Sequence, residues 1–147
     1  MWRNWLVASV ALVAAGCSVT PTAAAPAAVQ LPSSLVGTWQ RRDAYLVVGP
    51  TGTARLRWQT DWCGPGVPEP CDREVGDGVL LGAHAEISFD TDLRGVIVSV
   101  EPEGLFATGP ITLVRVGSDL IQLQQNDRTL ELCRPPRDLN LCDAVLM

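Results

Sequence analysis

Short runs of alternating apolar and polar residues, separated by turn-forming residues, dominate the chain from Leu35 onward. A period of two places alternate side chains on opposite faces of a β-strand, so each such run predicts a half-buried strand. The clearest run covers residues 54–62, and its expected inward face consists of Ala54, Leu56, Trp58, Thr60 and Trp62. The run over residues 83–90 follows the same rule, with Phe89 among its inward residues and His84 on the outward face.

Six further runs of this kind complete the pattern. They cover residues 36–41, 44–48, 95–100, 111–116, 120–124 and 129–133. The segments between the runs are rich in Gly, Pro, Asp and Asn, the residues of tight turns. No convincing helical period follows residue 34. About eight strands joined by short turns predict an all-β domain, an antiparallel meander that closes into a small barrel or folds into a small sandwich.

The first expected strand opens with the residues Leu35-Val-Gly-Thr-Trp39. This opening is similar to the Gly-x-Trp motif of lipocalin-like barrels, with Gly37 and Trp39 in the motif positions. In that family the Trp plugs the closed end of the barrel beneath an Arg from a late strand, a role that the resemblance gives to Arg128 or Arg134. The resemblance also implies a pocket for an apolar ligand, although inward Trp side chains in a short barrel can fill that space.

Residues 1–16 combine Arg3 with a run of small and apolar residues, which is typical of a secretory signal peptide. The run is shorter than the roughly 20 residues of a membrane-spanning helix. Its end, Val13-Ala-Ala-Gly-Cys17, resembles the lipobox of bacterial lipoproteins. That resemblance implies that Cys17 becomes the lipidated amino terminus, and that its acyl chains hold the protein on the extracytoplasmic face of the cell membrane. The alternative is cleavage after residues 23–25, which would give a secreted protein.

The stretch that follows the leader is predicted to be a spacer. Residues 17–33 carry no charge and no aromatic residue, and Pro21, Pro26 and Pro32 interrupt any helix. We expect Cys17 and this flexible tether to lift a single β-barrel domain, residues 34–147, off the lipid surface.

With Cys17 assigned to the anchor, four cysteines remain. An even number favours disulfide bonds in an exported domain. Three pairings are possible, and we favour Cys63–Cys71 with Cys133–Cys142 because each bond closes a short Pro-rich loop. Zinc-binding cysteine pairs are usually closer in sequence than these, so we expect no metal at the four thiols.

The composition argues against an enzyme and against nucleic-acid binding. The chain has eleven basic residues, all of them Arg, against sixteen acidic residues and one His. Nucleic-acid contact usually needs a basic face, and most acid–base and Schiff-base sites need His or Lys. Residues 90–101 match a calcium-binding loop at several positions, but Arg94 stands where an oxygen ligand is needed, so a hairpin turn is expected there. We expect no cofactor.

Together these features predict a membrane-anchored, non-enzymatic binding module for an apolar small molecule or a component of the cell envelope. The alternatives are a protein that inhibits a hydrolase by presenting rigid loops, and a structural lipoprotein of the envelope. For an extracellular protein partner the candidate binding tip is Trp62 with Val67, beside the loop that Cys63 and Cys71 would close. The alternation nevertheless favours core packing for Trp62.

Overall fold

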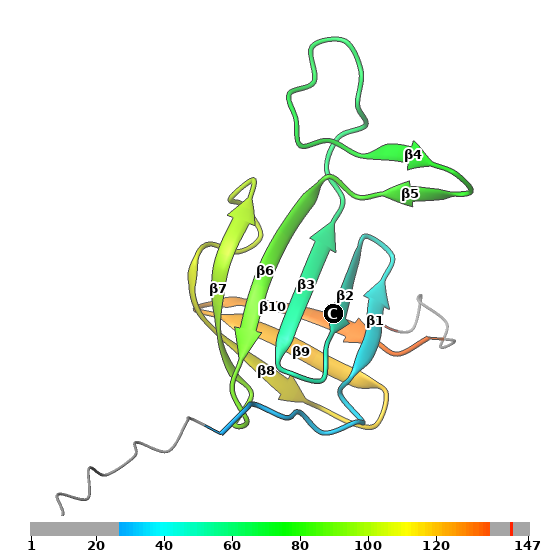
Figure 1. The fold of residues 1–147 in the computed structure, drawn as a ribbon. Coiled ribbons are helices and arrows are strands. Elements are labelled where there is room, and N and C mark those ends of the chain that lie inside the picture. Colours follow the sequence, from blue (N-terminus) through cyan, green and yellow to red (C-terminus); the bar gives the residue numbers. More distant parts are fainter. Residues whose placement is uncertain (1–26, 136–141, 143–147) are drawn as a thin grey trace, which may run out of the picture.

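The computed structural model describes residues 27–135 and Cys142, and its main body is a closed barrel of antiparallel strands (Figure 1). The ten strands are β1 (Gly37–Arg41), β2 (Ala44–Val48), β3 (Thr53–Trp58), β4 (Arg73–Val75), β5 (Gly78–Leu80), β6 (Ala83–Phe89), β7 (Arg94–Glu101), β8 (Gly109–Arg115), β9 (Leu120–Gln125) and β10 (Arg128–Cys133). Around the barrel the order is β1-β10-β9-β8-β7-β6-β3-β2, and β4 with β5 forms a separate two-stranded sheet. The predicted all-β meander is confirmed, and the first barrel strand pairs with the last.

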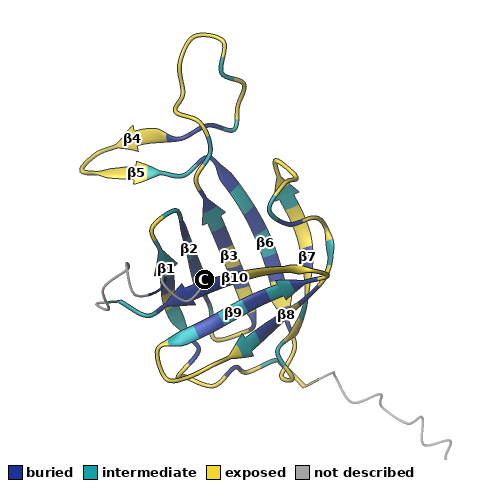
Figure 2. Ribbon diagram, turned by 180° about the vertical axis from the view of Figure 1, so that it is seen from behind, coloured by how far each residue is buried: buried dark blue, intermediate teal, exposed yellow. Residues whose placement is uncertain are grey.

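Buried and exposed positions alternate along several strands (Figure 2), and the buried side chains form an apolar core inside the barrel. In β3, for example, Leu56 is fully buried whereas Arg55, its neighbour, is exposed. The largest of the fully buried side chains are Trp39, Phe89, Phe106, Leu35, Leu46, Leu56, Ile97, Ile121, Leu123 and Leu132. A barrel of about eight strands is just wide enough for its inward side chains to fill. The inward positions are thus occupied by the protein's own core.

Residues before β1 also pack against the barrel. Leu31 is 3% exposed and belongs to the core cluster, and Val29 packs against the same cluster. The amide of Leu31 donates a hydrogen bond to the carbonyl oxygen of Pro50 (2.9 Å). The end of the stretch 17–33, expected as a tether, therefore takes part in the folded domain, because two apolar side chains there reach the core.

The expected leader, residues 1–16, and the expected lipidated Cys17 lie outside the described residues. So do residues 18–26 of the expected tether and most of the loop between Cys133 and Cys142. In the part of the chain that the structure describes, no helix is long and apolar enough to cross a lipid bilayer.

The strand expected over residues 54–62 ends early, at Trp58. The last residue pair between β3 and β6 is Trp58 with Ala83, and beyond it the chain leaves the barrel sheet. The prediction that Trp62 packs in the core is therefore wrong, and its side chain is 51% exposed. The alternation continues past Trp58 in sequence, but no barrel strand is left there to pair with the chain.

Candidate functional site

A projecting arm, which we define as residues 60–82, connects β3 to β6 at one end of the barrel (Figure 1). Because β3 and β6 are paired neighbours, the two ends of the arm leave the barrel side by side. The arm contains a loop closed by the Cys63–Cys71 disulfide, followed by the β4–β5 hairpin. The predicted Cys63–Cys71 bond is confirmed, whereas the hairpin was not expected from the sequence.

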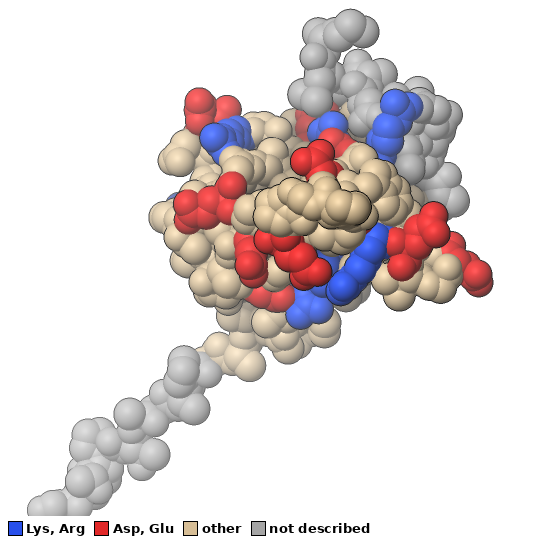
Figure 3. All heavy atoms as spheres, turned by 90° about the horizontal axis from the view of Figure 1, so that it is seen from above, with Lys and Arg blue, Asp and Glu red and all other residues tan. Residues whose placement is uncertain are grey.

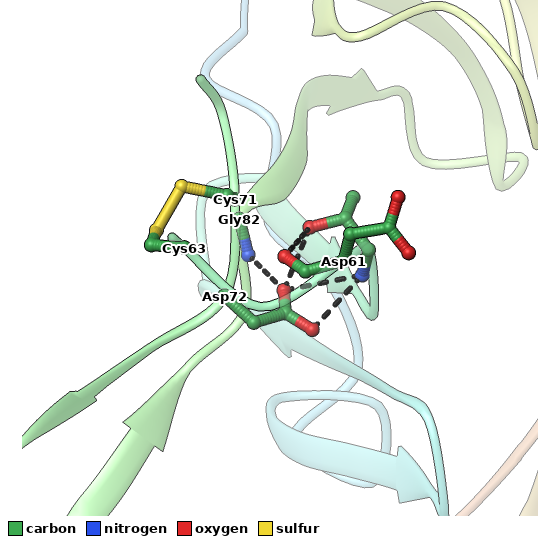
Figure 4. The surroundings of a disulfide bond; sticks show 6 residues. Asp61, Cys63, Cys71, Asp72 and Gly82 are labelled. Carbon is green, nitrogen blue, oxygen red and sulfur yellow. Dashed lines mark hydrogen bonds between the residues drawn. A yellow bond between two sulfur atoms is a disulfide. The ribbon is translucent and has the colours of Figure 1, made fainter. Parts of the chain in front are cut away.

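The two ends of the arm are joined by one buried carboxylate, that of Asp72, which is 1% exposed. The amide of Thr60 donates to both of its oxygens (3.1 and 3.0 Å), and the hydroxyl of Thr60 donates to Oδ1 (2.9 Å). From the other end of the arm, the amide of Gly82 donates to Oδ1 (2.7 Å), as Figure 4 shows. Hydrogen bonds to a charged acceptor are stronger than neutral ones, so Asp72 clasps the base of the arm.

Close backbone packing at Gly82 completes this base. A Cβ at Gly82 would lie 2.5 Å from the carbonyl carbon of Cys71 and 2.7 Å from its Cα. Any other residue would force these backbones apart, so the crossing requires glycine. Two main-chain hydrogen bonds also join the strands of the base. The amide of Cys63 donates to the carbonyl oxygen of Asp72 (2.8 Å), and the amide of Asp72 donates to the carbonyl oxygen of Asp61 (2.8 Å). The base is thus fixed by a disulfide, by main-chain bonds and by a side-chain clasp.

The arm presents apolar side chains to solvent. Trp62 is 51% exposed, Val75 is 56% exposed and Val79 is 48% exposed, and Val67 is half-buried in the disulfide loop. Val75 lies opposite Gly78 in the hairpin and Val79 lies opposite Glu74, so the two valines face opposite sides of the ribbon. Large apolar side chains in exposed positions are typical of recognition surfaces when they are held rigidly together.

The charges on the arm are mostly negative. Its exposed charged residues are Asp61, Glu69, Glu74, Asp77 and a single cation, Arg73. Figure 3, seen from above, shows acidic side chains, with several basic ones between them, around an uncharged area of this face. The arm therefore carries a net negative charge beside its exposed apolar side chains, which disfavours polyanions and favours a partner with positively charged residues.

The lipocalin-like resemblance assigned Gly37, Trp39, Arg128 and Arg134 to the closed end of the barrel. Three of them lie together in the structure, and Arg128 lies apart from them. The guanidinium of Arg134 stacks over the ring of Trp39, with its carbon 4.3 Å from the ring centroid, and the indole nitrogen of Trp39 donates to the carbonyl oxygen of Leu35 (2.9 Å). Gly37 has a φ of +119° and lies beside Arg134. Arg128, at the opposite end of β10, donates instead to the carbonyl oxygens of Gly104 and Leu105.

A second disulfide joins Cys133, the last residue of β10, to Cys142, with 6.1 Å between their Cα atoms. This pairing agrees with the expected one. Two disulfide bonds in one small domain indicate an oxidising, extracytoplasmic environment.

The segment considered as a calcium-binding loop, residues 90–101, forms a hairpin turn and the whole of β7. Between β6 and β7, Oδ1 of Asp90 accepts hydrogen bonds from the amides of Asp92 (2.9 Å) and Arg94 (3.0 Å). The carboxylate thus stabilises its own turn, a frequent role of Asp. Over residues 27–135 and Cys142, no group of three or more His, Cys, Asp or Glu side chains is arranged to hold a metal ion.

Sequence reasoning missed Asp72 and the β4–β5 hairpin. Asp72 was missed because its partners, Thr60 and Gly82, are distant in sequence, and nothing in the local pattern marks them. The hairpin had a weak signal, the Gly76-Asp77 pair between two short runs, which is a favoured pair in tight hairpins.

No protein-family model, no curated protein and no solved structure matches this chain.

Proposed function

We propose that this chain is a lipid-anchored, extracytoplasmic protein-binding module without catalytic activity, and that the arm is its recognition element. The observation that carries the proposal is the arm, which is fixed at its base by the Asp72 hydrogen bonds and the Cys63–Cys71 bond and carries exposed Trp62, Val75 and Val79. This corresponds to the alternative in which rigid loops are presented to a protein partner.

Rigidity matters because binding a protein costs conformational entropy. An ordered side chain loses about 0.5–1.5 kcal/mol of freedom when it is immobilised at an interface, and a preorganised loop avoids much of this cost. The Asp72 clasp and the Cys63–Cys71 bond order the arm before any partner arrives. Trp is also among the residues that contribute most binding energy at protein interfaces.

The packing of the barrel supports a protein partner over an apolar ligand inside the barrel. Trp39, Phe89 and Phe106 are fully buried and, with the aliphatic core, occupy inward positions. A ligand in the barrel would have to displace this core, whereas the arm offers its surface without rearrangement. The net negative charge of the arm supports a partner with positively charged residues.

Two features support the proposed extracytoplasmic, lipid-anchored location of the protein. The lipobox-like end of the leader supports lipidation of Cys17, and the two disulfides support an oxidising compartment. Because the arm is at one end of the barrel, a tethered protein can present it to the extracytoplasmic space.

Site-specific photo-crosslinking in the native cells tests the role of the arm. A benzoylphenylalanine at Val75 in the full chain is expected to capture one predominant extracytoplasmic protein, and Trp62→Ala in the same chain is expected to abolish the adduct. The matched control carries the crosslinker at Val98, an exposed valine on the outer face of β7. Equal adducts from Val75 and Val98, or an adduct that survives Trp62→Ala, would contradict the proposal.

Cell fractionation tests the anchor separately. Cys17→Ser is expected to shift the protein from the membrane to the soluble fraction, or to leave the leader uncleaved. Normal processing and unchanged membrane association of this variant would contradict lipidation at Cys17 and would leave the proposal for the arm standing.

A further inference from the structure

A hollow of about 250 Å³ lies between the root of the arm and the outer face of the barrel. Its charged lining comes from both walls: the barrel contributes Arg57 and Glu101 and the arm contributes Arg73 and Glu69. Pro70, Leu80 and Leu81 form apolar parts of the lining. The volume is just below the roughly 300–1,000 Å³ of pockets for drug-sized ligands, so this hollow fits a smaller molecule.

The barrel wall of the hollow is a row of three residues across neighbouring strands. Arg57 of β3 lies opposite His84 of β6, and His84 lies opposite Glu101 of β7. Two strand spacings place the backbones of Arg57 and Glu101 about 10 Å apart. The row therefore has a cation at one end, an anion at the other and an imidazole between them.

The charges around the hollow do not neutralise one another by direct contact. None of Arg57, Arg73, Glu69 and Glu101 forms an ion pair within the described part of the chain. By contrast Arg55 and Glu86, two residues further along the same two strands than Arg57 and His84, form a 2.6 Å pair. The guanidinium of Arg57 is instead oriented by the carbonyl oxygen of Leu81 (2.9 Å).

We propose that this hollow binds a small zwitterion, an amino acid whose carboxylate and ammonium groups pair with the arginine and glutamate side chains. A ligand with one charge only would leave the opposite charges of the lining unpaired. A zwitterion satisfies both signs at once, and a short apolar side chain would cover Leu80 and Leu81. Planar guanidinium groups suit carboxylate recognition in particular.

The hollow is also preformed. Its arm wall is fixed to the barrel by the Asp72 clasp, and its barrel wall belongs to a closed sheet. Of the four charged side chains, that of Arg57 is held by its hydrogen bond to Leu81, and a preorganised charge loses less entropy on binding than a mobile one. This inference does not depend on the arm binding a protein, since Trp62 is not part of the lining.

Nuclear magnetic resonance titration of the full chain, purified in detergent micelles, tests the ligand class. The probes are L-leucine, N-acetyl-L-leucine, which lacks the ammonium charge, and L-leucinamide, which lacks the carboxylate. We expect L-leucine to shift the amide signals of Leu81 and His84 and to bind at least about tenfold more tightly than either blocked compound. Equal binding of the three compounds, or no shift with L-leucine, would overturn the proposal.

Substitutions locate the site. Arg57→Gln and Glu101→Gln are each expected to weaken L-leucine binding about tenfold, while Arg55→Gln, on the same sheet face, leaves it unchanged. The fold of each variant is checked by its amide spectrum. Unchanged binding in Arg57→Gln, or an equal loss in Arg55→Gln, would place the ligand elsewhere and refute the site. Tighter binding of phosphoethanolamine than of L-leucine would identify a lipid headgroup as the ligand and overturn the amino-acid assignment.

Discussion

The barrel and the arm are ordered by different interactions. In the barrel, alternating side chains from eight strands bury one another in a continuous apolar core. In the arm, only Cys71, Asp72 and Gly82 are buried, and its order comes from one disulfide, one hydrogen-bonded carboxylate and main-chain hydrogen bonds. A segment too small to have its own core can thus be held rigid by a few specific bonds, while its apolar side chains remain available to a partner.

The largest loss of stability is expected from a substitution in the barrel core. Trp39→Ala removes a fully buried ring and the surface over which Arg134 stacks. We expect a loss of about 3–5 kcal/mol in the free energy of unfolding, as for other buried aromatic truncations. Urea denaturation followed by circular dichroism measures it. A loss below about 1 kcal/mol would contradict tight packing of the Trp39 ring in the barrel core.

The next largest loss of stability is expected from removing the Cys63–Cys71 disulfide of the arm. Replacing both Cys63 and Cys71 by Ser removes the covalent constraint that the disulfide places on the unfolded chain. The chain-entropy relation for a loop of this length gives a decrease of about 2.5 kcal/mol in the free energy of unfolding. The same denaturation experiment measures this loss. Glu69→Gln, inside the same loop, is the control and should leave stability unchanged. If the double variant matched this control, the disulfide would not contribute to the order of the arm.

A somewhat smaller effect is expected from the polar clasp. Asp72→Ala leaves the amides of Thr60 and Gly82 without an acceptor, which costs about 1–3 kcal/mol. Hydrogen exchange should become faster for amides of the arm while amides of β9 and β10 keep their protection. Asp77→Ala, at an exposed turn, provides the comparison. Uniform loss of protection across the barrel would show that the arm and the barrel unfold as one unit.

The smallest effect on stability is expected from Trp62→Ala, although the same substitution at Trp39 has the largest. Because Trp62 is half exposed, the change in unfolding free energy should stay within about 0.5 kcal/mol. Its consequence should appear instead in the loss of the crosslinked adduct from Val75. A large loss of stability would reassign Trp62 to packing within the arm.

The barrel was predictable because its interactions are periodic in sequence. Strands β2, β6 and β9 bury every second residue, and β2 and β6 could be placed within one residue of their observed ends. The closure of the strands into a barrel also agrees with the expected fold class. At Trp58 the same rule failed, because the alternation persisted in sequence after the pairing strand had ended.

The candidate site was harder to predict, since it depends on contacts between distant residues. The disulfide Cys63–Cys71 followed from cysteine spacing, and Trp62 was recognised as a candidate tip but assigned to the core. The bonds from Thr60 and Gly82 to Asp72, and the row of Arg57, His84 and Glu101, exist only once strands are in register. No local sequence pattern encodes that register.

The position of the arm between two directly paired strands has a consequence for evolution and engineering. Since Trp58 and Ala83 face each other across β3 and β6, a tight hairpin turn suffices to join them, and the eight-stranded barrel remains complete without residues 60–82. Insertions at such closely spaced ends are well tolerated. The barrel is therefore a scaffold with one exchangeable segment: a different disulfide-closed loop can replace residues 60–82 while the eight barrel strands stay the same.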